Sequence, residues 1–134
     1  MKAVRLLIGL LGLFALLAPS LAQADTYPDK PIRLIVPFPP GGPNDLIART
    51  IAQKMSEILK QTIVVDNKGG QGGVLGTDVV AKAAPDGYTI GVVSAGALAI
   101  SPSMEKVAYV TLRDLQPITL VAKVPEMLVV ATSV

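Results

Sequence analysis

Two glycine-rich segments contain the residues of this chain that are best suited to bind a ligand. They are residues 37–44 (PFPPGGPN) and residues 67–73 (NKGGQGG). Glycine lets the backbone approach a ligand closely, and the free N–H groups at the start of a helix attract anions. A carboxylate can therefore be held there without arginine or lysine. Tight turns without any ligand would have the same composition, so glycine and proline alone leave both interpretations open.

The remaining side chains offer little catalytic chemistry. The chain contains no His and no Cys, which removes the usual nucleophile–base pairs and the commonest metal ligands. Leu75 stands where a dinucleotide fingerprint needs its last glycine, and no glycine loop continues with Lys and then Ser or Thr. We therefore expect no enzymatic activity, no cofactor and no metal site. A small α/β enzyme with a phosphorylated cofactor is the disfavoured alternative.

Short apolar runs predict the strands that would position these segments. The runs are β-branched, nearly continuous in apolar residues and too short for helices, which is typical of strands covered on both faces, as in a parallel sheet. They lie at residues 32–36, 63–65, 89–93, 118–121 and 127–130.

Two helical patterns separate the first three runs. Asn44 is the expected N-cap of a helix that extends to Lys60, and its apolar face should contain Ile47, Ala48, Ile51, Ala52, Met55, Ile58 and Leu59. A second helix is expected over residues 74–83, with Leu75, Val79, Val80 and Ala83 facing inward. The order β-α-β-α-β predicts an α/β fold: a mostly parallel sheet with flanking helices. Both glycine-rich segments would then lie at the carboxyl ends of strands, where ligands bind in such sheets.

The first 24 residues have the layout of a secretory signal peptide. Lys2 and Arg5 precede the uncharged, leucine-rich residues 6–17, and Ala22 and Ala24 place small residues where signal peptidase cuts. The apolar run is shorter than the roughly 20 residues that span a bilayer. We expect residues 1–24 to be removed after export to the periplasm, and residues 25–134 to form the mature domain.

Removal of the signal peptide changes the charge balance of the chain. The full chain has 12 basic and 10 acidic residues, and Lys2 and Arg5 are both in the signal peptide, so 10 of each remain. A nucleic-acid partner requires a clustered positive surface, and we expect no such partner for this neutral domain.

Several ordered blocks of sequence resemble a known family. Residues 27–42 (YPDKPIRLIVPFPPGG) are followed by Asp45 and by Ala48-Arg49, and further blocks lie within residues 64–76, 80–89 and 114–122. Together they resemble the substrate-binding proteins of tripartite tricarboxylate transporters, the Bug family. The resemblance extends over essentially all of residues 25–134.

The resemblance implies a fold, a function and a site. Such proteins are bilobal α/β binders with a type II-like periplasmic-binding-protein fold, which close on a small organic carboxylate and deliver it to membrane permease subunits. The ligand's carboxylate is held by loops at the carboxyl ends of the first-lobe strands. Carried over by position, the expected ligand-binding residues are Phe38, Pro39, Pro40, Gly41, Gly42, Asn44, Asp45, Gly72, Gly73, Ser94, Ala95 and Gly96.

The length of the chain bears on this expectation. Members of the family are more than twice as long, so residues 25–134 are expected to be the first lobe alone, with the second lobe absent and the domain truncated. Two alternatives to a transport function stay open. The chain could be a solute-sensing partner of a signalling system, or a non-functional fragment of a binder.

Overall fold

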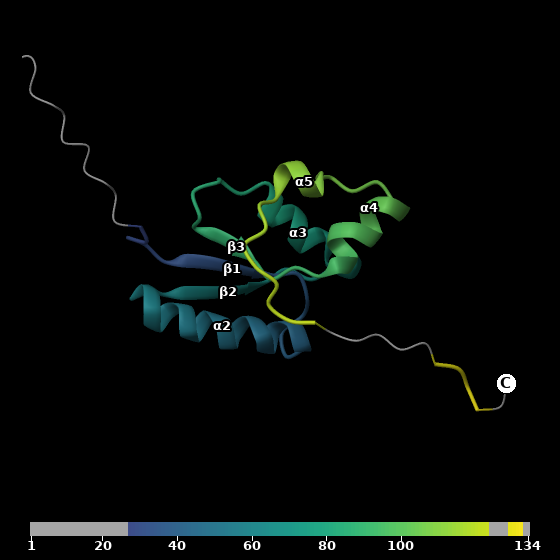
Figure 1. The fold of residues 1–134 in the computed structure, drawn as a ribbon, viewed down its shortest axis with the longest axis horizontal. Helices are drawn as coiled ribbons and strands as arrows, with labels where there is room; N and C mark the ends of the chain where they lie inside the picture. Colours follow the sequence, from purple (N-terminus) through teal and green to yellow (C-terminus); the bar gives the residue numbers. More distant parts are fainter. Residues whose placement is uncertain (1–26, 124–128, 133–134) are drawn as a thin grey trace, which may run out of the picture.

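A computed structural model describes residues 27–123 and 129–132 of the chain. The signal peptide predicted at residues 1–24 lies outside the described residues. Within the described part, no helix is both long and apolar enough to cross a membrane. The elements, shown in Figure 1, are β1 (Ile32–Val36), α2 (Pro43–Leu59), β2 (Ile63–Asn67), η1 (Gln71–Gly73), α3 (Val74–Ala81), β3 (Thr89–Gly91), η2 (Gly96–Ile100), α4 (Ser101–Met104) and α5 (Thr111–Asp114).

The three strands form one parallel sheet in the order β2-β1-β3. Leu34 at the centre of β1 pairs in register with Val65 of β2 and with Ile90 of β3. The helix α2 covers one face of the sheet and α3 covers the other (Figure 1). The crossover from β1 to β2 runs in one direction across the sheet, and the crossover from β2 to β3 runs in the other. Because both crossovers have the same hand, their helices must lie on opposite faces of the sheet. The predicted parallel α/β fold is thus confirmed.

The continuous apolar sequence of β1 follows from its central place. Of its five residues, all except Arg33 are buried. Leu34 and Val36 point to the same face, where they pack on Ala48 and Ala52 of α2 in the main core cluster. The two alanines are four residues apart and lie on one side of the helix, and their small side chains let the helix approach the sheet closely.

The ends and faces of the two long helices differ in detail from the sequence prediction. The N-cap of α2 is Gly42 and not Asn44, because Pro43 takes the first helical position, where its missing N–H costs nothing. Ile58 was expected to face inward but is exposed. The buried residues of α3 are Val74, Gly76 and Thr77. Leu75, predicted to face inward, is 51% exposed.

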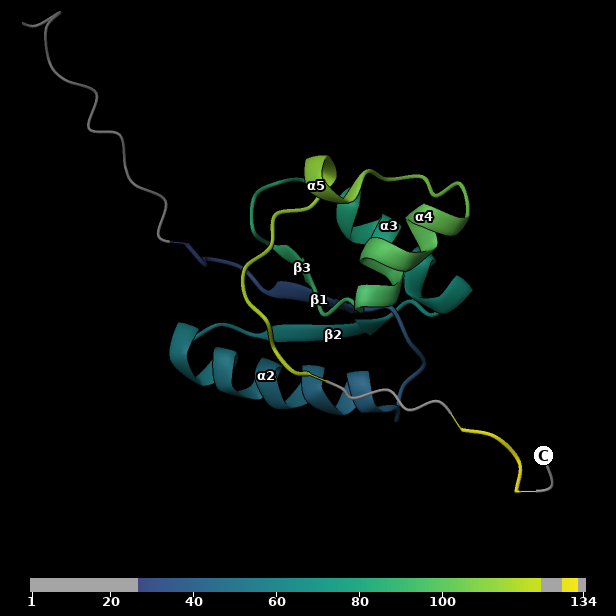
Figure 2. The same ribbon diagram turned by 45° about the vertical axis from the view of Figure 1, so that its right-hand side comes forward.

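The third strand is shorter than predicted and the fourth is absent from the described part. β3 ends at Gly91, although Val92 still donates its N–H to Ile35 O at 3.0 Å. The prediction of a strand at residues 118–121 is wrong, because these residues form no strand and are exposed. Figure 2 shows the chain leaving α5 and running toward α2 without joining the sheet. Apolar sequence alone does not make a strand, because a strand also needs a neighbouring edge to supply its hydrogen bonds.

The last predicted strand falls partly outside the described residues. Of residues 127–130, only 129 and 130 are described, and they are not in a strand.

Candidate functional site

Three loops meet at the carboxyl edge of the sheet. They are loop 1 (residues 37–42, after β1), loop 2 (residues 68–73, after β2) and loop 3 (residues 92–97, after β3). Gly73 of loop 2 lies next to both other loops: a Cβ placed on it would be 3.2 Å from Phe38 Cζ of loop 1 and 3.5 Å from the Cβ of Ala97 of loop 3. A Cβ on Gly69 would likewise be 3.3 Å from the ring of Pro39. The predicted segments are therefore brought together in space.

Loops 1 and 3 leave neighbouring strands toward opposite faces of the sheet. Loop 1 leads into α2, and loop 3 leads into η2 on the face that holds α3 (Figure 1). Such a switch point in a parallel sheet opens a crevice beyond the strand ends, which is the usual place for a ligand in α/β folds.

The start of α2 faces this edge with no side chain capping it. Leu46 is the first residue of the helix to donate to a loop carbonyl, that of Gly42, at 3.0 Å. Pro43 has no N–H, so the backbone donors of the first turn belong to Asn44 and Asp45. The helix has 17 residues, and the positive end of its dipole lies here. This end of α2 can attract an anion through backbone groups.

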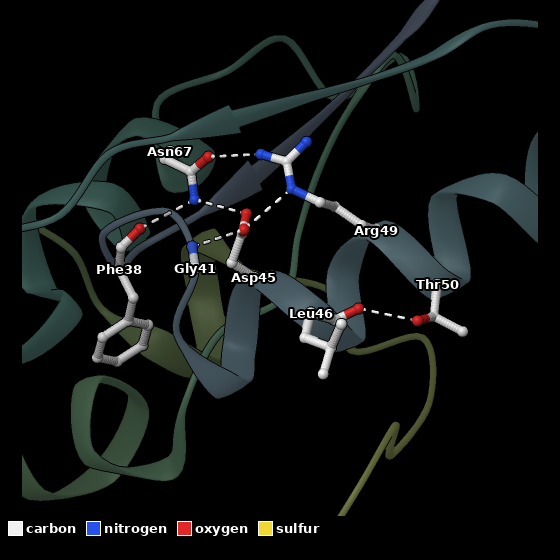
Figure 3. Close-up of polar contacts among 7 residues, drawn as sticks. All are labelled: Phe38, Gly41, Asp45, Leu46, Arg49, Thr50 and Asn67. Atoms are coloured by element: carbon white, nitrogen blue, oxygen red, sulfur yellow. Dashed lines mark hydrogen bonds and ion pairs between the residues drawn. The ribbon is translucent and has the colours of Figure 1, made fainter.

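The side chain of Asp45 is turned into loop 1, where it organises a group of hydrogen bonds that we call the Asp45 clasp (Figure 3). Its Oδ2 accepts from the Gly41 N–H and from Arg49 Nε, both at 2.9 Å. Its Oδ1 accepts from Asn67 Nδ2 at 2.9 Å, and Asn67 also donates to Phe38 O at 3.0 Å. Arg49 Nη2 completes the clasp by donating to Asn67 Oδ1 at 3.3 Å. The clasp fixes loop 1 to the end of β2.

The clasp occupies both oxygens of the Asp45 carboxylate and lowers its pKa. The side chain is only 5% exposed and both carboxylate oxygens are occupied. Hydrogen bonds from Arg49, from the Gly41 N–H and from Asn67 hold the pKa of Asp45 far below its usual range. The carboxylate of Asp45, one of the predicted binding residues, therefore holds loop 1 in place.

This lowered pKa predicts how stability depends on pH. A carboxyl whose pKa is lower in the folded state stabilises the fold above its unfolded pKa of about 3.9, and the stabilisation is lost as the pH falls below that value. The stability advantage of the chain over an Asp45→Asn variant should thus be constant from pH 7 to about pH 5 and should shrink below about pH 4. Urea unfolding at each pH measures it. An advantage that persists undiminished at about pH 2.5 would contradict an ionised, hydrogen-bonded Asp45.

The glycines of loop 2 have different surroundings. Gly70, Gly72 and Gly73 all have positive φ, and Gln71 shares this backbone region with φ of 48°. Gly73 is buried beneath the Phe38 ring, and its carbonyl accepts from Thr77 Oγ1 at 2.9 Å. Gly72 is exposed, and a Cβ placed there would meet nothing within 4 Å. Of the two residues predicted here, Gly72 is open to a ligand and Gly73 supports Phe38.

Loop 3 is anchored from a later part of the chain. Ser94 accepts from two N–H groups, that of Leu98 at its carbonyl (3.1 Å) and that of Ala97 at Oγ (3.4 Å), and Ala95 is exposed. The buried Tyr109 hydroxyl donates to Ala97 O, and Thr111 Oγ1 donates to Leu98 O at 2.7 Å. These contacts hold the end of loop 3 in place.

Sequence reasoning missed the residues that hold the loops in place. It assigned no individual role to Asn67 or to Arg49. The spacing of Asp45 and Arg49, four residues apart in a helix, is a signal that could have predicted their ion pair. Nothing local identifies Asn67, Tyr109 or Thr111, because their partners lie 12 to 29 residues away.

Comparisons with known proteins bear on the identity of this fold and site. Residues 47–134 match the model of the tripartite tricarboxylate transporter family receptor. The chain belongs to this receptor family. BugT of Bordetella pertussis (strain Tohama I) is 46% identical over 127 residues, which are 92% of this chain and 39% of BugT. The resemblance to Bug proteins in the sequence is therefore confirmed.

Solved structures agree with the fold. A periplasmic transporter is 45% identical, with a TM-score of 0.62 over 65% of this chain and 30% of that one. MatC of Rhodopseudomonas palustris, solved with bound malate, is 38% identical, with the same TM-score over 66% of this chain and 30% of its own. The chain thus spans less than half the length of these similar proteins.

Proposed function

We propose that this chain is the carboxylate-binding first lobe of a periplasmic receptor that delivers a small organic acid to the membrane permease subunits of a tripartite tricarboxylate transporter. The observation that carries the proposal is the convergence of loops 1, 2 and 3 beside the uncapped start of α2. A helix start with free N–H groups suits a carboxylate. MatC, which is similar in sequence and fold, has been solved with malate, which carries two carboxylates.

The twelve predicted ligand-binding residues divide into two groups on this proposal. One group would face the ligand. It consists of Gly41, Gly42, Asn44 and the backbone of Asp45 from loop 1 and the start of α2, Gly72 from loop 2, and Ser94, Ala95 and Gly96 from loop 3. Phe38, Pro39, Pro40 and Gly73 would shape the site, since Phe38 and Pro39 pack against the other loops.

Binding is tested with two proteins, because the chain spans only 30% of MatC. One is the mature chain, residues 25–134. The other is a MatC hybrid, in which the segment of MatC that matches this chain is exchanged for the corresponding residues of this chain. Isothermal titration with malate and a panel of short dicarboxylates should show binding by the hybrid, with weaker binding or none by the mature chain. A hybrid that unfolds cooperatively but takes up none of these acids, while MatC binds malate, would refute the function.

Export is a separate prediction. We propose that residues 1–24 are a signal peptide, so that Asp25 becomes the N-terminus. Tyr27, two residues later, already belongs to the fold. Its hydroxyl donates to Gly87 O at 2.8 Å, and its ring packs edge to face on the ring of Tyr88, with the ring centroids 5.0 Å apart. Mass spectrometry of the periplasmic fraction should find a chain that begins at Asp25. A full-length product in the cytoplasm would contradict export.

A further inference from the structure

The Asp45 clasp places a negative charge beside a site that is proposed to hold another. The Gly41 N–H donates to Asp45 Oδ2, so the carboxylate is one hydrogen bond away from the backbone of loop 1. Its very low pKa keeps it ionised throughout the physiological range. Like charges that approach each other repel, which would weaken the binding of a carboxylate ligand. The clasp therefore needs a compensating cation.

Arg49 supplies that cation. Its Nε lies 2.9 Å from Asp45 Oδ2, and its side chain is 52% exposed, whereas that of Asp45 is 5% exposed. Arg33 and Lys68 both pair with Asp66. Among the described residues, Arg49 is the cation that contacts Asp45.

The side chain of Arg49 provides hydrogen bonds to the clasp as well as a positive charge. Its Nε bonds Asp45 while its Nη2 reaches Asn67 Oδ1 at 3.3 Å, so one planar group contacts both residues that hold loop 1. A lysine has a single donor centre and could keep the charge without keeping both contacts.

We propose that Arg49 sets the affinity of this receptor for anionic ligands by neutralising Asp45, so that the clasp can hold loop 1 without repelling the ligand's carboxylate. Arg49 is a positioning residue in this arrangement: it acts through Asp45 and not on the ligand. The inference rests on the proposed carboxylate function and adds to it the residue that makes a carboxylate-based clasp compatible with a carboxylate ligand.

An alternative account treats the pair as an ordinary surface ion pair of a helix. Exposed pairs four residues apart stabilise a helix only slightly. Under that account, loss of Arg49 would lower stability a little and would change ligand affinity, if at all, by the same factor for every ligand. Charge compensation instead predicts an effect that grows with the charge of the ligand and diminishes with salt.

The test compares ligands of different charge in the MatC hybrid. The variants are Arg49→Met, Arg49→Lys and the double variant Asp45→Asn with Arg49→Met. The ligands are malate and its monoamide, which differ by one charge, and each is titrated at low and at high salt. Gln53→Met is the matched control, since Gln53 is an exposed residue of α2 outside the clasp. Thermal unfolding of each variant shows whether it is folded.

Arg49→Met should weaken malate binding about tenfold at low salt and the monoamide by a clearly smaller factor, and high salt should reduce the difference. Arg49→Lys should recover most of the affinity. The double variant should bind malate more tightly than Arg49→Met, because it lacks the uncompensated charge. If Arg49→Met does not fold, Asp45→Asn decides instead: its unpaired Arg49 should tighten malate binding relative to the double variant, by a factor that is larger than for the monoamide and that diminishes with salt.

Equal losses for malate and the monoamide, or losses that do not change with salt, would overturn the inference while leaving the carboxylate function in place. Unchanged affinity in Arg49→Met would overturn it as well. Failure of the unmodified hybrid to bind any of the acids would remove the proposed function, and the inference with it.

Discussion

Replacement of Gly76 by alanine is expected to lower the free energy of unfolding by about 2 to 3 kcal/mol, the upper part of the range for overpacked cores. A Cβ at this position would be 2.5 Å from Lys68 O and 2.7 Å from Pro37 Cα, and both are backbone atoms. Neither can move aside as a flexible side chain would. Gly76 lies where α3 packs against the first residues of loops 1 and 2, so the strain falls on the site as well as on the fold.

The sign of this effect makes it informative. Alanine in place of glycine inside an exposed helix raises stability by about 1 kcal/mol. A loss of stability at Gly76 can therefore not come from helix propensity. Urea unfolding of the MatC hybrid with and without Gly76→Ala measures the change, and Gln53→Ala on the exposed side of α2 is the control that should be nearly neutral. An unchanged or higher stability in Gly76→Ala would show that α3 does not pack this closely on Pro37.

Replacement of Gly42 by valine should abolish malate binding by the hybrid while the fold is retained. Gly42 has φ of −80° and ψ of 171°, an extended conformation that any residue adopts. A Cβ there would have its nearest neighbour, Pro39 O, at 3.7 Å, an ordinary contact. The valine would instead project beside the first-turn N–H groups of α2 that are proposed to meet the ligand. We expect the affinity to fall at least about a hundredfold, as when a ligand group loses several backbone hydrogen bonds.

Two further variants separate blocking of the site from strain. Gly42→Ala adds a single methyl group and should weaken binding less than valine does. Gly41→Ala should lower stability, since Gly41 has φ of 84°, which side chains rarely adopt. Calorimetry and circular dichroism on the same samples distinguish the two effects. Full malate affinity in a folded Gly42→Val hybrid would remove loop 1 from the binding site.

The sequence determined the order of the main elements and the place of the glycine loops. β1, α2, β2, α3 and β3 were all predicted near their observed positions, because helix and strand periodicity and turn residues are local properties. A parallel sheet puts the carboxyl ends of its strands at one edge, so the meeting of loops 1, 2 and 3 followed from topology. The family was also evident from the residues, and the comparison confirmed it.

The tertiary structure decided which groups in those loops are free. Sequence alone could not show that the Asp45 carboxylate is occupied by Asn67, 22 residues away, or that Gly73 is buried under Phe38 while Gly72 is open. It also could not show that residues 118–121, apolar as they are, would lie outside the sheet. These outcomes depend on contacts between distant segments, and such contacts are set by packing across the whole fold. Local pattern places a loop at the site, but its neighbours in space decide which of its atoms can meet a ligand.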